Sequence, residues 1–578
     1  MWGDTPVTDE PELTRRRLLA LSTATAGGAA FGVGSVAAEE DRSRRDDTVE
    51  SHDGTELALT VYRPAGAAAD EPAPMILHSH GWSGSRTSAA GAFGRELEAG
   101  FGVLSFDQRG HGESGGQAHV QNPALEGRDV VEILDYVEAL EWVADDRSDP
   151  TVFAMGGSYG GAYQLVGALT ETALTGRTRF DGLAPQITWF DLSESLAPEG
   201  VVRSAWVSAL YAAGAANVPE FVHRAFLYGS ATGRWPDGDD PAEPDLDSRF
   251  YRNGPSGFLD PQDGFCRQRV RLDVPVLFGQ GTSDNLFNLN QAWKNFERTL
   301  AEPARRRSAV VAYNGGHALP NALPPGQLNF DDACSPDGDF GDLRLRFFRA
   351  VLDGGGARDV VGSPYSLTTA DGSRCLALET LSDRETLATG VDLELAHDGD
   401  GRLSVERAAG LDGRTLARTE GFPGEYDPET ATTAATAAAA VTETETEGGS
   451  VATPTGAGAP VHLELADGPL TVGGVPTLSA TVTTVGVDQR VFFALSVGES
   501  PATARIVQNN MLPLRESEPV VGADRTVELP GVAVDVADGE RLYLTVSAVS
   551  DMSFAHGSTR TPGAVALKDL SVGVPTVE

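Results

Sequence analysis

Short apolar segments alternate with helix-like segments between about residues 57 and 352. A chain in which strand and helix patterns follow one another predicts βαβ units and a mostly parallel sheet. In the segment RDVVEILDYVEALEWV, apolar side chains recur at the i, i+3, i+4 and i+7 positions of one helical face. The strands that we expect are 74–80, 102–107, 151–155, 275–281 and 309–314.

The alternation stops between about residues 185 and 265. This stretch is rich in Trp, Tyr and Phe and has no clear strand pattern, so we expect a helical cap inserted into the α/β region. The segment 340–354 returns to helical spacing and ends in glycines. We expect it to be the closing helix of the α/β region.

Beyond about residue 355, short runs of β-type residues are separated by turn signals, as in VHLELADG, TLSATVTTV and RLYLTVSAV. This pattern is typical of an all-β sandwich. Residues 427–460 are acidic, of low complexity and have almost nothing to bury, so we expect a disordered loop or linker there.

The predicted fold class is therefore α/β, with an inserted helical cap and a C-terminal all-β, jelly-roll-like domain. The expected boundaries are 39–184 and 269–354 for the two parts of the α/β core, 185–268 for the cap and 355–578 for the β domain. A chain of 578 residues, 40% of them hydrophobic, is long enough for several cores.

The charge balance adds an expectation about the solvent. The chain has 83 Asp and Glu against 44 Lys and Arg, a net charge of −39, and its only lysines are Lys294 and Lys568. Such a charge destabilises a compact state in dilute salt, whereas at about 1 M salt the Debye length is only ~3 Å. The composition resembles that of proteins from salt-in halophiles. A cation-binding acidic protein is disfavoured because the acids are not clustered, and a nucleic-acid partner is disfavoured because no basic stripe exists.

The N-terminal segment carries a candidate export signal. TRRRLLA at residues 14–20 has twin arginines, a weakly apolar stretch follows, and small residues near Ala37 and Ala38 suit cleavage. We expect residues 1–38 to be a twin-arginine signal, with the twin-arginine translocase as partner during export and an extracellular or cell-surface destination. The three cysteines allow one disulfide and one free thiol, and their pairing stays open.

Two stretches match Gly-x-Ser-x-Gly, the pattern of the nucleophile elbow of α/β-hydrolases: GESGG at 112–116 and GGSYG at 156–160. An elbow needs a strand directly before the serine and a helix directly after it. Ser158 has both, since TVFAM precedes it and AYQLVGALTETAL follows it. Ser114 lies in a long glycine-rich loop. We therefore expect Ser158 to be the nucleophile and Ser114 to be a loop residue near the site.

A nucleophilic serine needs a general base and an acid that orients it. In α/β-hydrolases the acid and then the base follow the serine along the chain, on loops after later strands. His317 follows the expected strand 309–314 in a glycine-rich turn, and Asp284 follows the strand 275–281. We expect His317 to be the base and Asp284 the acid, although Asp284 also suits the N-cap of the next helix.

The oxyanion of an acyl-transfer intermediate needs two N–H donors. We expect them to be the backbone N–H groups of Tyr159, after the nucleophile, and Trp82, in the loop after the first main strand. This chemistry requires no metal and no organic cofactor. The turn HDGDGR at 397–402 resembles a calcium loop but lacks the full ligand series and the closing Glu, so a solvated acidic turn is favoured.

Several phrases together resemble the cocaine-esterase and X-Pro dipeptidyl-peptidase family of serine hydrolases (CocE/NonD, peptidase S15). They are DQRGHGESGG at 107–116, GGSYGG at 156–161, VPVLFGQGTSDNLF at 274–287 and the later GGH. The resemblance implies an α/β-hydrolase core, a helical cap and a C-terminal jelly-roll domain. It also implies Ser158, Asp284 and His317 as the catalytic triad, in agreement with their positions along the chain.

One phrase departs from the family. Members commonly place a tyrosine hydroxyl in the oxyanion hole, whereas this chain has HSHGW after the first main strand. A dipeptidyl-peptidase also needs carboxylates near the cap that recognise the substrate amine, for which Asp191, Glu194 and Glu199 are the candidates.

The function that we expect is a secreted, halophilic serine hydrolase that cleaves a small carboxylic ester or an amide through an acyl-enzyme. The alternative is an X-Pro dipeptidyl-peptidase acting on short peptides. A non-catalytic surface- or carbohydrate-binding protein is a third reading, disfavoured because a binding module has no need of a complete triad.

Overall fold

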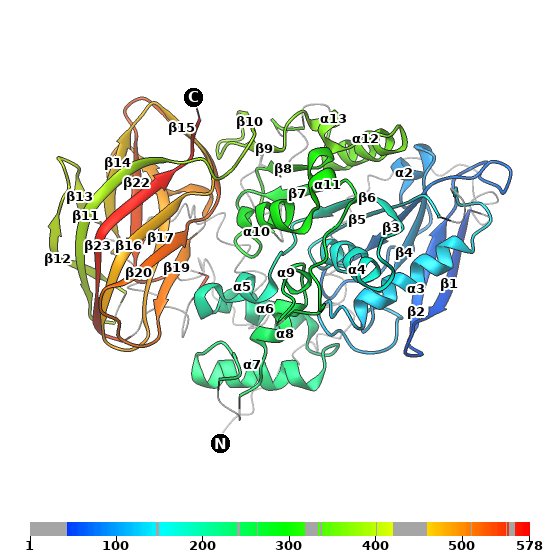
Figure 1. Cartoon of the computed structure of the whole chain (residues 1–578), viewed down its shortest axis with the longest axis horizontal. Helices are drawn as coiled ribbons and strands as arrows, with labels where there is room; N and C mark the ends of the chain where they lie inside the picture. The colour runs from blue at the N-terminus through cyan, green and yellow to red at the C-terminus, as the bar shows by residue number, and fades with distance from the viewer. Residues whose placement is uncertain are drawn as a thin grey trace, which may run out of the picture.

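The computed structural model describes residues 43–145, 149–239, 243–262, 264–317, 333–335, 338–399, 401–419, 459–509, 511–550, 552–553 and 561–577. The expected signal segment 1–38 and nearly all of the low-complexity segment 427–460 lie outside these residues. The described part forms a sheet-and-helix core at one end, a β domain at the other, and a helical cap beside them (Figure 1). None of its helices is long and apolar enough to cross a membrane.

A ten-stranded sheet runs through the described core in the order β1-β2-β4-β3-β5-β6-β7-β8-β9-β10. Neighbours from β4 to β9 pair in parallel, and β1, β2 and β10 add antiparallel edges. All five expected strands are present. The bounds are β1 Arg44–Glu50, β2 Glu56–Tyr62, β3 Met75–Ser79, β4 Gly102–Phe106, β5 Val152–Gly157, β6 Phe180–Gln186, β7 Leu277–Gly281, β8 Ala309–Tyr313, β9 Tyr365–Thr368 and β10 Cys375–Leu378.

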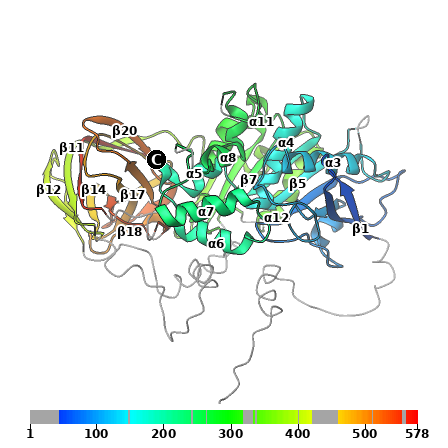
Figure 2. The ribbon, with the colours of Figure 1, turned by 90° about the horizontal axis from the view of Figure 1, so that it is seen from below.

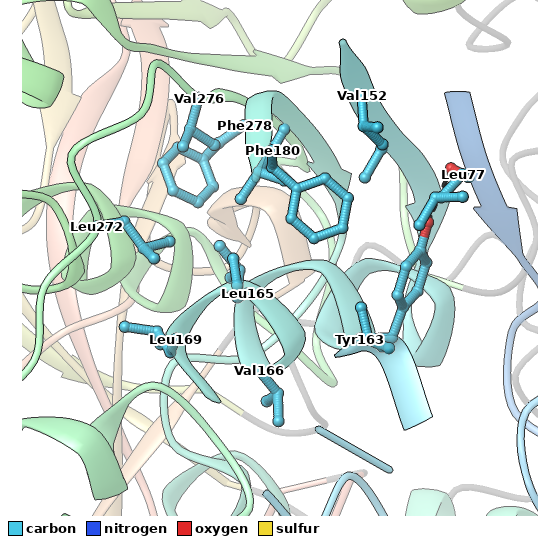
Figure 3. Close-up of a cluster of buried hydrophobic side chains, with 14 of the residues drawn as sticks. Leu77, Val152, Tyr163, Leu165, Val166, Leu169, Phe180, Leu272, Val276 and Phe278 are labelled. Atoms are coloured by element: carbon cyan, nitrogen blue, oxygen red, sulfur yellow. Dashed lines mark hydrogen bonds between the residues drawn. The ribbon is translucent and has the colours of Figure 1, made fainter. Parts of the chain in front are cut away.

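Helices cover both faces of this sheet, because successive strand residues point to opposite sides. In β3, Met75 and Leu77 pack with α3 and α4, whereas Ile76 packs with α12 and α13 on the other face. Figure 3 shows Leu165 and other α4 side chains among the strand residues of the first face. The bounds are α2 Gly94–Glu98, α3 Glu126–Glu138, α4 Tyr159–Thr175, α10 Leu289–Lys294, η3 Asn295–Thr299, α11 Glu302–Arg307, α12 Phe340–Leu352 and α13 Ala357–Val361.

The inserted segment after β6 is helical, as expected. Its three tryptophans and Phe250 form a separate apolar cluster with residues of the core beneath it, including Tyr159 and Phe287. Figure 2 shows the cap helices α6 and α7 together along one edge of the molecule. The bounds are α5 Leu192–Leu196, η2 Pro198–Gly200, α6 Ser204–Gly214, α7 Glu220–Thr232, α8 Asp247–Arg252 and α9 Ser256–Leu259.

The C-terminal part consists of antiparallel sheets that share one apolar core. One sheet has the order β12-β11-β23-β16-β20, and a second has β13-β14-β22-β17-β18 with β19 also paired to β17. A small sheet, β21-β15-β24, lies beside them. The bounds are β11 Glu385–His397, β12 Leu403–Ala409, β13 Leu416–Arg418, β14 Val461–Asp467, β15 Leu470–Gly474, β16 Thr477–Val485, β17 Gln489–Gly498, β18 Arg505–Ile506, η5 Val507–Asn509, β19 Leu512–Glu516, β20 Ala523–Glu528, β21 Val532–Val536, β22 Arg541–Ser547, β23 Gly563–Val574 and β24 Thr576–Val577.

The predicted fold class is confirmed, with one boundary displaced. We expected the β domain to begin at residue 355, but β9 pairs in parallel with β8 and β10 pairs with β9, so the core sheet continues to Leu378. β9 and β10 are short runs separated by a turn, and in the sequence they have the same pattern as the strands of the β domain that follows.

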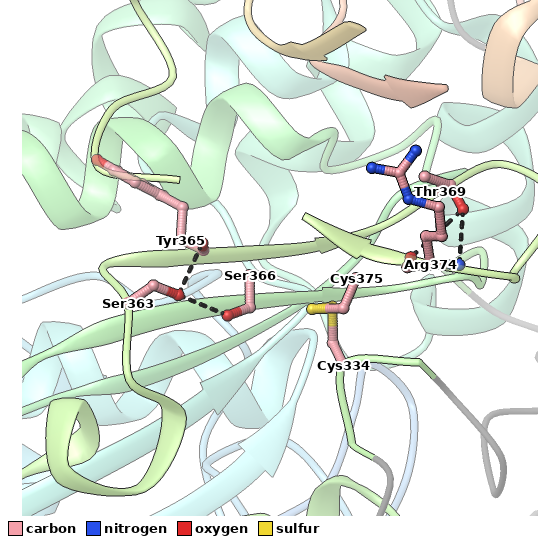
Figure 4. The surroundings of a disulfide bond; sticks show 7 residues. All are labelled: Cys334, Ser363, Tyr365, Ser366, Thr369, Arg374 and Cys375. Carbon is pink, nitrogen blue, oxygen red and sulfur yellow. Dashed lines mark hydrogen bonds between the residues drawn. A yellow bond between two sulfur atoms is a disulfide. The ribbon is translucent and has the colours of Figure 1, made fainter. Parts of the chain in front are cut away.

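One disulfide joins β10 to the segment that precedes α12. Cys375 at the start of β10 is bonded to Cys334 (Figure 4). The third cysteine, Cys266, is free. This answers the pairing that the sequence left open. The bond attaches the edge of the core sheet to the chain between β8 and α12.

Candidate active site

The second Gly-x-Ser-x-Gly match forms a strand–turn–helix elbow. β5 ends at Gly157, α4 begins at Tyr159, and Ser158 between them has φ 56° and ψ −121°, a conformation that is strained for a residue with a side chain. A Cβ atom on Gly160 would lie 2.4 Å from the carbonyl oxygen of Ser79, so only glycine fits there. The turn therefore presents the Ser158 hydroxyl at the carboxyl end of the sheet.

Three side chains distant in sequence meet at this elbow. The Ser158 Oγ lies 3.0 Å from Nε2 of His317, and Nδ1 of the same ring lies 2.8 Å from Oδ2 of Asp284. His317 follows β8 and Asp284 follows β7, so neighbouring parallel strands deliver both groups to one edge of the sheet. The structure thus brings together the three residues that we predicted as nucleophile, base and acid.

Hydrogen bonds fix the orientation of the Asp284 carboxylate, which is fully buried. Its Oδ1 accepts from the backbone N–H groups of Leu286 at 2.9 Å and Phe287 at 2.8 Å. The Gln280 amide donates to Oδ2 at 3.4 Å. The following helix, α10, has Asn288 as its N-cap, so Asp284 is not the cap that we considered as an alternative. Its second oxygen is directed at the imidazole.

This arrangement determines which nitrogen of His317 holds the proton. A carboxylate only accepts hydrogen bonds, so Nδ1 of the ring donates to Asp284. Nε2 is then unprotonated in the neutral ring and can accept the hydroxyl proton of Ser158. Trp206 and Phe287 pack edge-on against the imidazole, with ring centroids 5.5 Å and 4.9 Å away.

Ser114, in the first Gly-x-Ser-x-Gly match, is bonded to backbone groups. Its hydroxyl donates to the carbonyl oxygen of Asp107 at 2.7 Å and accepts from the N–H of Ala58 at 2.8 Å. Asp107 lies in the loop after β4, and Ala58 lies in β2. Ser114 therefore holds the glycine-rich loop against the sheet.

The two residues predicted to supply oxyanion donors lie side by side. The Trp82 and Tyr159 rings pack edge to face with centroids 5.1 Å apart, and the Trp82 indole N–H donates to the carbonyl oxygen of Leu210 in the cap at 2.8 Å. Tyr159 is the first residue of α4, where backbone N–H groups point out of the helix. The donor role of the two backbone N–H groups stays a prediction.

His80 stabilises the loop that carries Trp82. Its Nδ1 donates to the carbonyl oxygen of Gly81 at 2.8 Å, and its Nε2 accepts from the N–H of Gln108 at 3.2 Å. Burial, together with the nearby His111, lowers the pKa of His80 to about 4, so the ring is neutral at pH 7. Both nitrogens are therefore engaged in holding the loop.

A cavity of about 320 Å³ opens beside Ser158, between the cap and the core. Most of its lining is apolar or aromatic, and among the described residues Arg234 is the only charged one that lines it. The sequence indicated this site only through the aromatic richness of the cap. The large aromatic residues of the wall include Trp82, Trp189, Phe226, Trp235, Phe250 and Phe287.

The carboxylates proposed for recognising a substrate amine do not line this cavity. Asp191 is the N-cap of α5, where it accepts from the N–H of Glu194 at 3.1 Å, and burial raises its pKa to about 7. The Glu194 carboxylate is paired with Lys294. Burial also raises the pKa of Glu199. Within the described part of the chain, no three or more His, Cys, Asp and Glu residues form a group that could hold a metal.

The chain is similar to hydrolases over its core. Residues 53–318 match the family described as X-Pro dipeptidyl-peptidase (S15 family). Two curated proteins of Escherichia coli match shorter stretches: an uncharacterized 31.7 kDa protein of the traX-finO intergenic region, 32% identical over 104 residues, and YcjY of strain K12, 28% identical over 117 residues. These stretches cover 18% and 20% of this chain, and only 35% and 37% of the two relatives.

Solved structures with a similar fold extend over nearly the whole chain. An aminopeptidase from a marine sediment archaeon (Thaumarchaeota archaeon) has a TM-score of 0.59 at 15% identity, covering 96% of this chain and 100% of its own. A CocE/NonD family hydrolase from Staphylococcus aureus has a TM-score of 0.56 at 12% identity, covering 92% and 93%. An α-amino acid ester hydrolase has a TM-score of 0.54 at 14% identity, covering 96% and 99%. These likenesses confirm the expected architecture.

Proposed function

Because residues 53–318 match the family described as X-Pro dipeptidyl-peptidase (S15 family), we propose that this chain cleaves carboxylic esters through an acyl-enzyme on Ser158. The observation that carries the proposal is the pair of hydrogen bonds that link Ser158 to His317 at 3.0 Å and His317 to Asp284 at 2.8 Å. A chain of nucleophile, base and orienting carboxylate is what acyl transfer at a serine requires.

The reaction begins when the Ser158 hydroxyl attacks the ester carbonyl while Nε2 of His317 takes its proton. The N–H of Tyr159 and that of Trp82 stabilise the negative oxygen of the tetrahedral intermediate. The imidazolium then gives its proton to the departing alcohol, which leaves an acyl-serine. Water, deprotonated by His317, attacks the acyl group and releases the acid, and Ser158 regains its proton. The buried Asp284 carboxylate stabilises the imidazolium in both steps.

The size and lining of the cavity beside Ser158 favour a substrate whose acyl group is uncharged and apolar. A volume of about 320 Å³ is within the range of small-ligand pockets. Moving an ammonium group from water into an apolar cavity without a partner carboxylate costs several kcal/mol. Because no carboxylate lines the cavity among the described residues, an ester with an apolar acyl group is the favoured substrate class.

X-Pro dipeptidyl-peptidase activity is the second candidate, favoured by the family match of residues 53–318. Such an enzyme must bind the free amine of a peptide. The buried and paired states of Asp191 and Glu194 argue against these carboxylates in that role. A non-catalytic binding protein is the third candidate, and the triad geometry argues against it.

We also propose that the enzyme is exported by the twin-arginine pathway and acts outside the cell or at its surface, in concentrated salt. The arginines of the N-terminal segment and the net charge of −39 support this. The disulfide between Cys334 and Cys375 is a further support, since disulfides persist in oxidising compartments and are rare in the cytosol of mesophiles.

Labelling with a fluorophosphonate in about 2 M KCl, followed by peptide mapping, tests the nucleophile. We expect the label on the peptide that contains Ser158, its loss in Ser158→Ala and its retention in Ser114→Ala. Label on Ser114 would overturn the assignment of the nucleophile, and a fully folded protein without label would favour the binding-protein candidate.

A matched pair of substrates tests the substrate class. p-Nitrophenyl hexanoate and its 6-amino derivative have the same chain length and differ by one ammonium group, and the longer chain avoids the rapid closure to a five-membered lactam that a 4-amino ester undergoes. We expect kcat/KM to be at least about 100-fold higher for the neutral ester, because about 3 kcal/mol of desolvation corresponds to that ratio. Hydrolysis of Gly-Pro-p-nitroanilide at a comparable kcat/KM would instead support the peptidase.

A further inference from the structure

A buried arginine of the cap contacts the loop that carries the triad acid. Arg203, directly before α6, is 4% exposed. Its Nη1 donates to two successive carbonyl oxygens, that of Asn285 at 2.5 Å and that of Leu286 at 2.6 Å. These carbonyls belong to the same turn whose N–H groups hold the carboxylate of Asp284. The cap therefore forms hydrogen bonds to the carbonyl groups of the turn whose N–H groups orient the acid.

A second residue of the same helical turn extends this contact to the base. The indole N–H of Trp206 donates to Oδ1 of Asn285 at 2.9 Å, and its ring packs edge-on against His317. The N–H of Ala205, between the two, donates to the carbonyl oxygen of Met552 in the β domain at 3.3 Å. The segment 203–206 thus connects the cap, the β domain and two members of the triad.

The guanidinium of Arg203 is a positive charge close to the Asp284–His317 pair. Asp284 and, from α5, Glu194 interact with it electrostatically, and burial lowers its pKa to about 10, so it remains charged at pH 7. No carboxylate forms an ion pair with it among the described residues. Among the described residues, the groups that contact the pair include Ser158, the Gln280 amide and the rings of Trp206 and Phe287, which are uncharged, and Glu194 is itself paired with Lys294.

We propose that Arg203 is a positioning residue for the hydrolytic reaction: it fixes the acid turn through two carbonyl groups and, by its charge, weakens the attraction of Asp284 for the proton on His317. The inference rests on the proposed function. Two effects follow. Loss of the two hydrogen bonds loosens the acid and lowers kcat, while loss of the charge makes the imidazolium more stable and raises the pH at which His317 becomes an active base.

The test measures the rate of fluorophosphonate labelling of Ser158 against pH, because this rate reports the nucleophile and its base without requiring the natural substrate. In Arg203→Met we expect labelling to be at least about tenfold slower. We also expect the acid limb of the pH–rate profile, where the labelling rate rises as His317 loses its proton, to move up by about half a pH unit or more. In Arg203→Lys, which keeps the charge, the acid limb stays within about 0.2 pH unit of the wild type while the rate still falls. With p-nitrophenyl butyrate, kcat falls and KM stays within about twofold.

Controls separate this role from a general structural one. Arg490, whose side chain is 3% exposed and paired with Asp488, is a buried arginine in the β domain, and Arg490→Met is expected to lower stability without moving the acid limb. If Arg203→Met does not fold, Trp206→Phe removes the indole N–H to Asn285 together with part of the ring that packs against His317, and is expected to slow labelling at least about threefold.

Three results would overturn the proposal: an unchanged labelling rate and acid limb in folded Arg203→Met, a loss confined to KM, or the same limb shift in Arg203→Lys. These three results can be told apart from a failure of the proposed function. That failure would appear as an absence of label in the wild-type protein, and it would overturn both the proposed function and the role of Arg203.

Discussion

At the scale of single residues, Asp284 shows how one carboxylate sets the protonation of another group. In Asp284→Asn, the amide oxygen can keep the bonds to the N–H groups of Leu286 and Phe287, so the amide nitrogen then faces Nδ1 of His317. That nitrogen donates, so Nδ1 must accept and the ring proton moves to Nε2, where it blocks removal of the Ser158 proton.

We therefore expect Asp284→Asn to lower kcat about 10³- to 10⁴-fold while the protein remains folded. The measurement is kcat for p-nitrophenyl butyrate, with circular dichroism as the check on folding. A loss of less than about tenfold would show that Asp284 does not set the tautomer.

The two Gly-x-Ser-x-Gly serines give opposite predictions. Ser114→Ala removes one bond to the carbonyl of Asp107 and one from the N–H of Ala58, so we expect it to lower the free energy of unfolding by about 1–3 kcal/mol and to leave kcat within about twofold. Urea unfolding and ester hydrolysis measure the two quantities. Ser158→Ala should do the reverse: we expect a near-complete loss of activity and a free energy of unfolding within about 1 kcal/mol of the wild-type value.

The sequence predicted the triad because that information is local and ordered: a strand before Ser158, a helix after it, and Asp284 and His317 after later strands. The cavity wall and Arg203 could not be found in the same way. Their positions depend on how the cap packs against the core, and no spacing rule relates residue 203 to residue 285. A buried arginine in a cap has no sequence signature until its partners are known.

At the scale of elements, Asp191 shows how burial of a helix N-cap carboxyl makes the stability of the fold depend on pH. Burial raises the pKa of this N-cap of α5 from 3.8 to about 7. A carboxyl group whose pKa is raised on folding contributes stability that is present below pH 4 and is lost as the pH rises through about 7. Asp191→Asn can still accept the N–H of Glu194 but does not titrate.

We expect Asp191→Asn to gain stability relative to the wild type as the pH rises from 4 to 8, by up to about 4 kcal/mol. Chemical denaturation across this pH range measures it. Asp239→Asn, which changes an exposed carboxylate of the same cap, is the control and should show a flat difference. If Asp191 bound a substrate amine instead, kcat/KM for Gly-Pro-p-nitroanilide would collapse in the variant.

The disulfide is the second prediction at this scale. It closes a loop of 41 residues between the chain before α12 and the edge strand β10. Closing such a loop lowers the entropy of the unfolded chain and so raises the free energy of the unfolded state by about 4 kcal/mol. Cys334→Ala combined with Cys375→Ala should lower Tm by several degrees and abolish the effect of a reductant, whereas Cys266→Ser should change neither. A reductant that leaves the wild-type Tm unchanged would contradict this.

Elements that the sequence missed have physical explanations. Gly182 and Pro185 interrupt the apolar run of β6, although its place between β5 and β7 makes it an interior strand. β9 and β10 were assigned to the β domain because a short strand carries no mark of the sheet that it will join. Pairing partners, like the partner of Cys375, are decided by tertiary packing.

At the scale of the whole molecule, the junction of the three parts is held by short-range contacts in an acidic protein. Lys294, 6% exposed, pairs with Glu194 of the cap and, at 3.1 Å, with Glu528 of the β domain. The Asn290 side chain exchanges two hydrogen bonds with the backbone of Leu529 and Gly531. Buried pairs of this kind are screened little by salt, whereas repulsion among surface carboxylates is screened strongly.

Salt should therefore stabilise the fold, because it removes the repulsion and leaves the junction intact. We expect Tm to rise by about 10 °C or more between about 0.1 and 2 M KCl, with the steepest rise below about 1 M, where the Debye length falls from about 10 Å to about 3 Å. Differential scanning calorimetry measures it, and KBr at equal ionic strength is the control, since screening does not depend on the anion but salting-out does. A Tm that is constant below about 1 M KCl, or that follows the anion, would show that self-repulsion of the −39 charge does not limit the stability of this fold.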